Sequence, residues 1–478
     1  MSTEWSADEI RRVGYRVVDL IAQHLASMPE RPVFTPVPPD LIKQFGEAPV
    51  PQRGTTADRV LDEFARTIEP YPFGNGHPRF WGWVNSPPLA IGVFAEALAA
   101  AMNPSCAGGN HAAIYVEREV IAWFREMLAF PASGMGLLVS GGSMATLTAL
   151  AVARHVKCGV GVRTDGLRGS SSPFRFYRSP EGHTCMQKAV ELLGFGSSSI
   201  RTIPADFDGR FDVAALEAAI ALDLKAGARP IAVYASAGTV NAGAIDPLAD
   251  IAAVCRRHDV WLHVDAAYGG PAILTDEYRT ALAPLNLADS VALDPHKWLS
   301  VPVEAGLVLV RDAEAMRATF SLVPPYIRGA GSATGVMGLP WLSEYGFQQT
   351  RGFRALKVWM ALKYMGIEGY TRTIEANLAL ARYLIERLRR DAAFELVASG
   401  LSIVCFRFAP PSLDDDAIDR LNRALLERLQ LGGDAFITST EIADRFVLRA
   451  CIVNHRSTRD DVDCLLEAIR RIGSDLSR

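Results

Sequence analysis

The chain has 478 residues, of which 49% are hydrophobic and 21% are charged, and its formal net charge is −4. This composition is typical of a globular enzyme and excludes a mainly disordered chain, while the negative charge argues against nucleic acid or an anionic membrane as the main partner. The seven cysteines are scattered and contain no CxxC pair. This pattern favours a reducing compartment such as the cytoplasm, and it argues against both a disulfide framework and a zinc site. No bound metal is therefore expected.

The first 85 residues are predicted to contain a helix at 6–27 and an extended arm. Apolar residues recur at helical spacing through 6–27, and Ser6 with Glu9 predicts a capping box at its start. The arm is expected to run extended because of its prolines, which are Pro29, Pro32, Pro36, Pro38 and Pro39. One helix and an arm cannot bury a core of their own, so we expect this region to pack on another surface, with a loosely attached tail as the alternative. The acidic N-terminus lacks the apolar segment of a signal peptide.

One uncharged stretch, residues 127–153, is long enough to cross a bilayer. It contains Pro131 and four glycines, and its apolar run breaks around 140–143, so a spanning helix would expose unpaired backbone to lipid. A buried strand, a glycine turn and a buried helix are predicted here instead, and no membrane association is expected.

Residues 86–365 are predicted to form a large α/β domain. Short apolar runs alternate there with helix-like segments such as 247–259, and each run is continuously apolar, as in strands covered on both faces by helices. This βαβ organisation predicts a mostly parallel, doubly wound sheet whose ligands bind at the carboxyl ends of the strands. The predicted strands are 136–140, 231–236, 260–265, 290–294 and 306–310.

Residues 366–478 are predicted to form a smaller α+β domain. Long helical stretches alternate here with apolar runs at 394–408 and 446–453, and Thr458 with Asp461 predicts a capping box for the last helix. The chain is therefore expected to divide into 1–85, 86–365 and 366–478.

Four short segments at predicted strand ends carry candidate site residues. Gly142 and Ser143 lie in a Ser-Gly-Gly-Ser turn before a helical run, where free N–H groups and the helix dipole favour a phosphate. Such turns are common, so this pattern is weak by itself. His183 stands at the entry to a second helix, where a capping or surface role is the alternative.

The other two segments contain a buried acid and a buried lysine. Asp265 closes a strongly apolar strand, and a protonated pyridine nitrogen would offset the cost of its burial, with a buried arginine or a capping role as the alternative. Small residues after it, Ala267 among them, leave room for a flat ring. Lys297 follows the next strand in Asp294-Pro295-His296-Lys297-Trp298, and burial is expected to lower its pKa so that its amine can form a Schiff base. The alternative is a structural lysine that reaches solvent.

In this order, the four segments supply what pyridoxal phosphate needs. They offer an anion cradle, a ring contact, an acidic partner for the ring nitrogen and an amine for the aldehyde. The sequence therefore predicts a pyridoxal-phosphate enzyme.

The chain resembles the group II pyridoxal-phosphate decarboxylases, and most of all the aromatic-L-amino-acid decarboxylases. The segments that carry the resemblance are HPRFWGW, SGGSMATLTAL, HTCMQKA, GTVNAGAIDP, VWLHVDAAYGG, DPHKW, RALKVW and FVLR. The resemblance implies a PLP-dependent transferase-like fold, that is, fold type I of the aspartate aminotransferase type. It also implies a homodimer with the active site near the subunit interface, in which the N-terminal helix and arm wrap the partner.

The resemblance assigns catalytic roles to four residues. Lys297 resembles the Schiff-base lysine, Asp265 the partner of the ring nitrogen, and His183 the histidine that stacks on the ring. Tyr326 matches the mobile-loop tyrosine that returns a proton to the substrate. Further cofactor contacts are implied at Gly142, Ser143, Thr239, Ala267, Asp294 and His296.

The chain departs from the family pattern at several positions near the cofactor and the substrate. Asp294 stands where many animal members have asparagine, and its charge would repel a phosphate unless another group compensates. Val240 and Asn241 replace threonines, so only Thr239 carries over there. An aromatic residue of the animal enzymes falls near Ala107.

We expect the substrate to be a small aromatic L-amino acid that is decarboxylated to its amine. Trp83 and Ser86 are the predicted substrate contacts, and Trp81 is a further candidate lining residue, with core packing as the alternative for both tryptophans. Three other functions stay open. They are decarboxylation of an acidic or diamino acid, an aldehyde synthase of the same family, and a catalytically silent binding module of the same fold.

Overall fold

The computed structural model describes residues 4–159, 161–168, 170–322 and 334–477. The chain divides into two compact units, one made of 88–381 with 398–404 and the other of 1–87 with 382–397 and 405–478. The N-terminal region and most of the C-terminal region thus belong to the same unit. The predicted division into 1–85, 86–365 and 366–478 stays a prediction.

Seven strands form the sheet of the first unit, in the order β1-β7-β6-β5-β4-β2-β3. Strands β2 to β6 run parallel to one another, while β7 is antiparallel to both β1 and β6. All five predicted strands are present, and the prediction of a mostly parallel sheet is confirmed. The strands are β1 Met135–Val139, β2 Phe174–Arg178, β3 Ile200–Thr202, β4 Arg229–Ser236, β5 Trp261–Asp265, β6 Ser290–Leu293 and β7 Gly306–Val310.

Two strands of this sheet, β2 and β3, were not predicted. β2 reads Phe-Arg-Phe-Tyr-Arg and β3 has three residues, so neither gives the continuous apolar run of a doubly covered strand. They lie at one end of the strand order, where full burial on both faces is not required.

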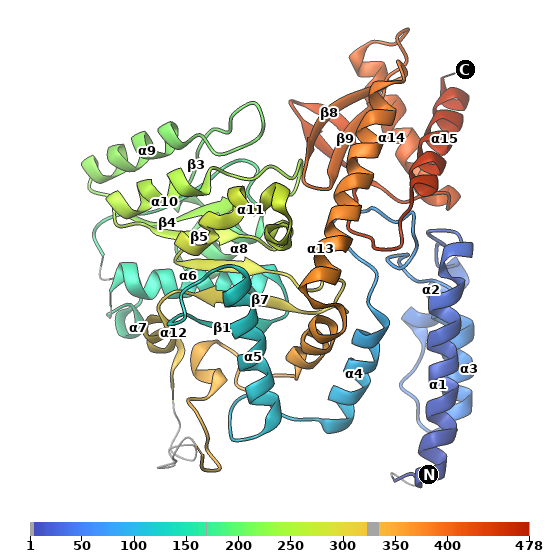
Figure 1. Cartoon of the computed structure of the whole chain (residues 1–478), viewed down its shortest axis with the longest axis horizontal. Helices are drawn as coiled ribbons and strands as arrows, with labels where there is room; N and C mark the ends of the chain where they lie inside the picture. The colour runs from blue at the N-terminus through green and yellow to red at the C-terminus, as the bar shows by residue number, and fades with distance from the viewer. Residues whose placement is uncertain (1–3, 160, 169, 323–333, 478) are drawn as a thin grey trace. The chain divides into compact units, whose positions relative to one another are not determined.

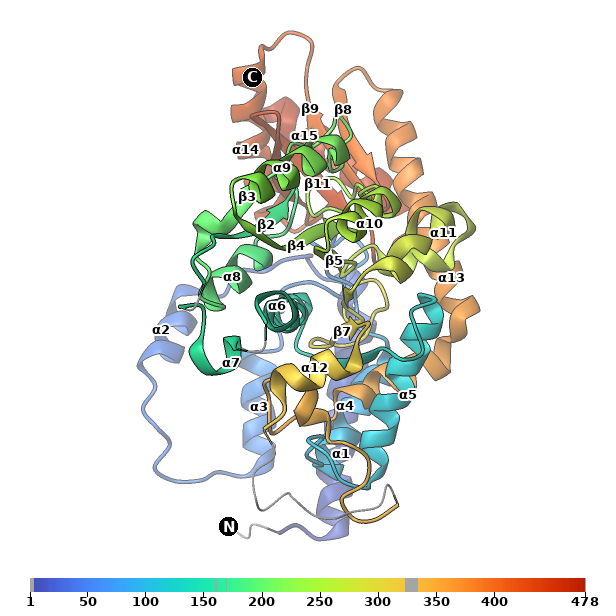
Figure 2. The ribbon, with the colours of Figure 1, turned by 90° about the vertical axis from the view of Figure 1, so that its left-hand side faces the viewer.

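Helices cover both faces of this sheet (Figure 1). α9 (Val213–Lys225) and α10 (Leu248–Arg257) lie on one face, and α6 (Gly142–Cys158) lies on the other. Figure 2 looks nearly along the axis of α6 and shows how it lies beneath the strands. Ala145, Ala149 and Ala153 are buried and recur at every fourth position of α6, so small side chains let the helix lie close to the sheet.

The uncharged stretch at 127–153 forms a strand, a glycine turn and the start of a helix, as predicted. It comprises β1, the turn at Ser140–Gly141 and most of α6. Within the part of the chain that the structure describes, no helix is long and apolar enough to cross a membrane.

The remaining helices of this unit surround the sheet or flank it. They are α4 Ala90–Met102, α5 Ala112–Met127, α7 Val162–Asp165, α8 Cys185–Leu192, α11 Asp276–Leu282, α12 Ala313–Phe320 and most of α13 Arg354–Arg389. Gly366 interrupts α13 with a φ of 62°, a left-handed conformation that glycine adopts without strain.

The N-terminal part of the second unit begins with the predicted helix, α1 (Ala7–Ser27). Ser6 Oγ accepts the N–H of Glu9 at 3.2 Å, which confirms the cap. The Glu9 side chain instead pairs with Arg12 at 2.9 Å, so the reciprocal half of the predicted capping box was wrong: a guanidinium offers a stronger partner than a backbone N–H. α2 (Pro39–Glu47) and α3 (Ala57–Thr67) follow. The prediction that the prolines of the arm exclude helix was wrong at two of them: Pro29 lies in a 3₁₀ turn at Met28–Glu30, and Pro39 is the first residue of α2, where a helix tolerates proline because the missing N–H would have no partner there.

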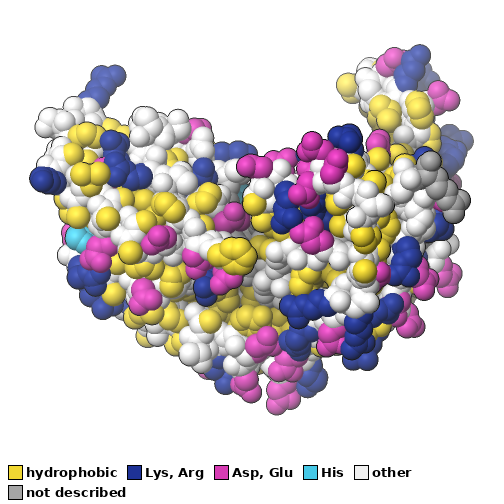
Figure 3. All heavy atoms as spheres, turned by 90° about the horizontal axis from the view of Figure 1, so that it is seen from above, with side chains coloured by type: hydrophobic (Ala, Val, Ile, Leu, Met, Phe, Trp, Pro, Cys, Tyr) yellow, Lys and Arg dark blue, Asp and Glu magenta, His cyan; other side chains and the backbone are white. Residues whose placement is uncertain are grey.

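The C-terminal part of the second unit contributes a four-stranded sheet, in the order β10-β11-β9-β8. The predicted capping box at Thr458 and Asp461 is present in both halves, with hydrogen bonds of 3.4 and 2.9 Å. The elements are β8 Phe394–Gly400, β9 Ile403–Phe408, α14 Asp415–Gly432, β10 Thr438–Ile442, β11 Arg445–Cys451 and α15 Arg459–Leu476. On the face of the molecule shown in Figure 3, basic and acidic side chains are intermingled.

A buried ion pair ties β1 to the helix before it. Glu117 of α5 is fully buried and accepts the N–H of Leu138, and Arg351 pairs with Glu117 while donating to the carbonyls of Cys106 and Leu138. The charges therefore sit within a complete hydrogen-bond network rather than as an isolated pair.

Replacing Arg351 with alanine should destabilise the protein by about 3 to 5 kcal/mol, because Glu117 would remain buried without its counter-charge. The measurement is the free energy of unfolding from urea denaturation. Arg257→Ala is the control, since the Arg257–Glu217 pair is exposed and its loss should cost at most about 1 kcal/mol. Equal losses in the two variants would contradict this account of the buried pair.

Candidate active site

The carboxyl ends of three parallel strands meet at one edge of the large sheet. Ser236 of β4 pairs in register with Asp265 of β5, which pairs in turn with Ala292 of β6. Asp265 therefore lies at the end of a central strand, and the segment from Asp294 to Lys297 follows directly at the same edge. The order of the strands brings the predicted acid and the predicted lysine together.

Both carboxylate oxygens of Asp265 accept hydrogen bonds. Oδ1 accepts the backbone N–H of Ala267 at 3.0 Å, and Oδ2 accepts the phenol of Tyr234, which is buried in β4. Neither of these partners is the buried arginine that was one alternative, but the bond from Ala267 is a local capping interaction, which was the other alternative. The carboxylate is thus held in one orientation at the end of β5.

Lys297 faces two carboxylates. Its Nζ lies 3.2 Å from Oδ2 of Asp294, whose side chain is 2% exposed. Burial lowers the pKa of Lys297, but the negative charges of Asp294 and Asp265 and the hydrogen bond to Asp294 raise it by more, so the pKa of Lys297 lies above its usual value. The prediction that burial leaves a lysine of lowered pKa was therefore wrong, because it considered desolvation without the neighbouring carboxylates.

The start of α6 lies against the same residues. A Cβ added to Gly142 would meet Asp294 Oδ2 at 3.0 Å and the Cβ of Ala267 at 3.2 Å, so glycine lets the helix end approach this edge closely. Gly141 stands at the N-cap without a capping side chain, and Ser143 is exposed in the first turn. The first N–H groups of a helix have no partner within it, and here they are available to an anion.

Asp294 and His296 border this helix end. Oδ1 of Asp294 is buried and has no hydrogen-bond partner among the described residues. Nε2 of His296 lies 3.9 Å from Oδ2 of Asp294, and its Nδ1 lies 2.7 Å from the carbonyl of Ala305. The ammonium group of Lys297 compensates the negative charge of Asp294.

His183 precedes α8 and is exposed. Its Nδ1 accepts the N–H of Cys185 at 3.1 Å, so it also has the local capping role that was the alternative. Partial desolvation lowers the pKa of His183 and the charge of Lys297 lowers it further, against the opposing effects of Asp265 and Asp294. A neutral, exposed imidazole anchored through one nitrogen can present its face to a flat ring.

Thr239 has a structural partner in the turn after β4. Its Oγ1 accepts the N–H of Ala244 at 3.0 Å, and the residue is buried. Asn241 donates to Glu181 at 3.0 Å. The role of Thr239 as a cofactor contact stays a prediction.

The predicted substrate contacts belong to the other compact unit, and Tyr326 lies outside the described residues. Trp83 is 47% exposed and packs on Phe73 and Phe436, with ring centroids 5.2 and 5.5 Å apart. Trp81 is fully buried and donates to Ser457 at 2.8 Å, which favours core packing for this tryptophan. Trp83 and Ser86 stay predictions.

Tyr234 is the residue of this site that the sequence analysis did not single out. It stands in an otherwise apolar strand, and a phenol in such a place needs a hydrogen-bond partner. One indication in the sequence is that Tyr234 stands two residues before the carboxyl end of β4, and ligands were expected at the carboxyl ends of the strands.

These residues fit pyridoxal phosphate. The start of α6 and its close approach at Gly142 suit a phosphate, the fixed carboxylate of Asp265 suits a pyridine nitrogen, and the amine of Lys297 suits an aldehyde. No group of three or more His, Cys, Asp or Glu side chains in the described ranges could hold a metal ion.

Comparison with known proteins agrees with this geometry. Residues 38–409 match the pyridoxal-dependent decarboxylase conserved domain. The chain belongs to this family. It is 35% identical to an aromatic-L-amino-acid decarboxylase of Bacillus atrophaeus, over 99% of this chain and 97% of the relative, and 31% identical to human cysteine sulfinic acid decarboxylase, over 92% and 90%.

A solved structure of Oryza sativa TDC with PLP and tryptamine is similar over 100% of both chains, with a TM-score of 0.93 and 27% identity. The predicted PLP-dependent transferase-like fold, fold type I, is confirmed, and the chain is a pyridoxal-phosphate-dependent amino acid decarboxylase.

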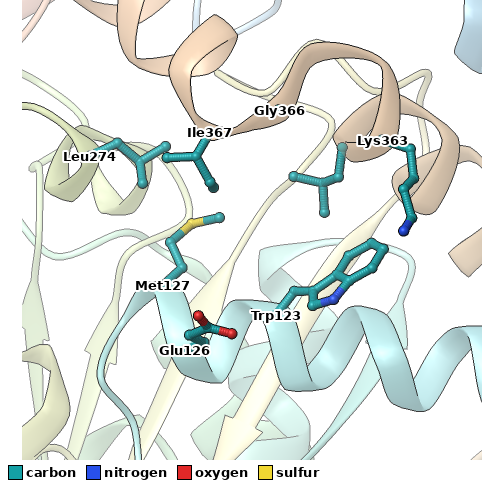
Figure 4. Close-up of a pocket in the computed structure, with 8 residues that line it drawn as sticks. Trp123, Glu126, Met127, Leu274, Lys363, Gly366 and Ile367 are labelled. Carbon is teal, nitrogen blue, oxygen red and sulfur yellow. The ribbon is translucent and has the colours of Figure 1, made fainter.

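A separate pocket of about 400 Å³ lies between α5 and α13 (Figure 4). Its walls are largely apolar, and its charged side chains are Glu126 and Lys363. Lys363 lies over the ring of Trp123, 5.2 Å from its centroid. None of the predicted site residues lines this pocket.

Asp294→Asn should speed cofactor uptake by the apoprotein at pH 7. The substitution removes the nearest negative charge, so the pKa of Lys297 falls and more of its amine is unprotonated; one pKa unit would give about a tenfold faster uptake. The gain should shrink as the pH rises toward the pKa of Lys297. The measurement is the rate of appearance of the visible absorbance band on mixing.

Pyridoxal without its phosphate is the control ligand for this experiment. An equal gain with pyridoxal attributes the effect to Lys297, whereas a gain confined to the phosphate ester attributes it to repulsion by Asp294. Uptake that is unchanged or slower in Asp294→Asn would contradict the electrostatic account.

Proposed function

We propose that this decarboxylase acts on an aromatic L-amino acid and releases the corresponding amine and carbon dioxide. The observation that carries the site assignment is the cluster of Lys297, Asp294 and Asp265 beside the start of α6. The aromatic substrate is supported by the names of the bacterial relative and by the tryptamine bound to the rice protein.

The residues at this site have distinct proposed tasks. Lys297 Nζ holds the aldehyde of the cofactor, and Asp265 keeps a proton on its ring nitrogen. Gly142 and Ser143 bind the phosphate through the start of α6, His183 stacks on the ring, and His296 with Thr239 completes the contacts. Ala267 leaves space beneath the ring. When bound, pyridoxal phosphate would supply an electron sink for the bond between Cα and the carboxylate of the substrate.

Tyr326 is the proposed proton donor to Cα after carbon dioxide leaves. A tyrosine phenol can supply a positioned proton as a general acid. The resemblance supports this role, since family members with phenylalanine at this position tend to be aldehyde synthases.

An acidic substrate is the second candidate, because human cysteine sulfinic acid decarboxylase is also similar over most of its length. The test is incubation of the holoenzyme with a panel of aromatic, acidic and diamino acids, with amine, aldehyde and carbon dioxide identified by mass spectrometry. Release of amines from aromatic acids supports the proposal, and selective release from acidic ones replaces it. A Lys297→Ala variant, lacking both turnover and the visible absorbance band, is the control for background reactions.

Tyr326→Phe should lower amine formation and raise aldehyde and hydrogen peroxide, because oxygen can then compete for the reactive carbon. We expect at least about a tenfold fall in amine release, within the range usual for loss of a general acid. The measurement is the ratio of amine to aldehyde together with peroxide detection. Wild-type amine release without peroxide would show that Tyr326 is not the donor.

We also propose a homodimer with the active site near the subunit interface. α1 exposes apolar side chains along one side, with Ile10 56%, Val17 36% and Val18 43% exposed. An exposed apolar helix face of this kind is typical of an association surface.

We also propose that the protein works in a reducing compartment such as the cytoplasm, because its cysteines are scattered along the sequence.

Removing residues 1–28 should abolish the stable dimer and cause aggregation, because the surfaces that the helix covers would face water. Ile10→Asp with Val18→Asp should weaken association in the full chain, while Asp19→Lys, an exposed change on the opposite side of α1, should not. Light scattering coupled to size exclusion measures both outcomes. A stable, active monomer of the truncated chain would contradict the proposal.

A further inference from the structure

Tyr234 occupies a central place behind the proposed cofactor site. Its ring is buried in β4, and its phenol donates to Oδ2 of Asp265. A Cβ added to Gly182 would lie 3.4 Å from the Tyr234 ring, so the ring also packs beneath the backbone that precedes His183. One side chain thus supports both the proposed partner of the ring nitrogen and the proposed stacking residue.

A hydrogen-bonded chain of uncharged groups fixes Tyr234 from the other side. The sulfur of Cys185 lies 3.7 Å from the Tyr234 oxygen and 3.8 Å from Oγ1 of Thr146. Thr146 contacts Nε2 of His263 at 3.2 Å, and Nδ1 of His263 lies 2.9 Å from Ser290 Oγ. Tyr234 therefore has little freedom to turn away from Asp265.

The protonation states of these hydrogen-bonded groups define the direction of the bond between Tyr234 and Asp265. Burial and the charge of Asp265 raise the pKa of Tyr234 well above its usual value, so the phenol keeps its proton. Burial lowers the pKa of His263 to about 4 and raises that of Cys185 to about 11, so both are neutral near pH 7. Within this chain of groups Asp265 carries the charge, and Tyr234 donates to it.

We propose that Tyr234 is a positioning residue of the decarboxylase, whose phenol holds the carboxylate of Asp265 in the orientation in which it can meet the pyridine nitrogen. Hydrogen bonds to a carboxylate are short and strong, so the phenol and the N–H of Ala267 together restrict rotation of the Asp265 side chain. A carboxylate held in this place would favour the protonated form of the ring nitrogen, which is the better electron sink. This inference rests on the proposed role of Asp265.

The test compares Tyr234→Phe with a matched control, Tyr177→Phe. Tyr177 is a buried tyrosine of the neighbouring strand β2, and its phenol donates to a carboxylate, Asp223, at 2.9 Å. Tyr177 pairs in register with Val233, the residue before Tyr234, so the two phenols point to opposite faces of the sheet. Both variants lose one buried phenol, but only Tyr234→Phe alters the surroundings of Asp265.

Tyr234→Phe should lower kcat about tenfold with KM within about twofold, and should weaken binding of pyridoxal phosphate to the apoprotein about tenfold, as expected for loss of a hydrogen bond to a charged group. The pH dependence of the visible absorbance of the bound cofactor should also shift. The titratable groups that face Asp265 are Lys297, Asp294, His183, Cys185, Tyr234 and His263. Tyr177→Phe should lose stability without these changes.

The Asp265→Asn variant distinguishes a failure of the role proposed for Tyr234 from a failure of the role proposed for Asp265. If Tyr234 acts through Asp265, adding Tyr234→Phe to Asp265→Asn should change cofactor affinity and kcat by less than about twofold further. Wild-type kcat, affinity and pH profile in Tyr234→Phe would overturn the inference while leaving the role of Asp265 intact. Near-normal activity of Asp265→Asn itself would overturn the proposed site assignment instead. Equal effects of Tyr234→Phe and Tyr177→Phe would reduce Tyr234 to a structural role.

Discussion

Two carboxylates and one ammonium group share the carboxyl edge of a parallel sheet, and the site depends on how these charges offset one another. Asp265 and Asp294 end neighbouring strands, and Lys297 lies 3.2 Å from Asp294. Burying any one of the three alone would be costly. Together they leave an excess of negative charge, which the start of α6 and a cationic ring nitrogen are suited to balance. The close approach of the helix at Gly142 is what makes that balance available.

The groups behind this edge are polar but uncharged. Tyr234, Cys185, Thr146 and His263 connect by hydrogen bonds through the interior between α6 and the sheet. Because burial keeps His263 neutral, the chain adds dipoles and no further charge around Asp265. Such an arrangement fixes geometry without competing for the proton that the chemistry requires.

The residues proposed to hold the cofactor and the residues predicted to contact the substrate belong to different compact units. The cofactor residues lie in the unit that contains the large sheet, whereas Trp83 and Ser86 lie in the unit that contains the N-terminal helices. Family members of closely similar fold have names that refer to aromatic acids and to cysteine sulfinic acid. One fold can therefore carry more than one substrate class, because the choice of substrate is set by individual site residues and not by the fold.

The sequence by itself determined the elements whose pattern is local, because continuous apolar runs, glycine turns and helix caps depend on neighbours in the chain. It located β4 to β7, the turn at Gly142, and the acid and lysine that end two strands. The tertiary structure alone decided the contacts between distant residues: the bond of Tyr234 to Asp265, 31 positions away, and the pairing of Glu117 with Arg351. It also decided the pKa of Lys297, since that depends on how near two carboxylates lie and not on burial alone, and no spacing along the chain specifies such distances.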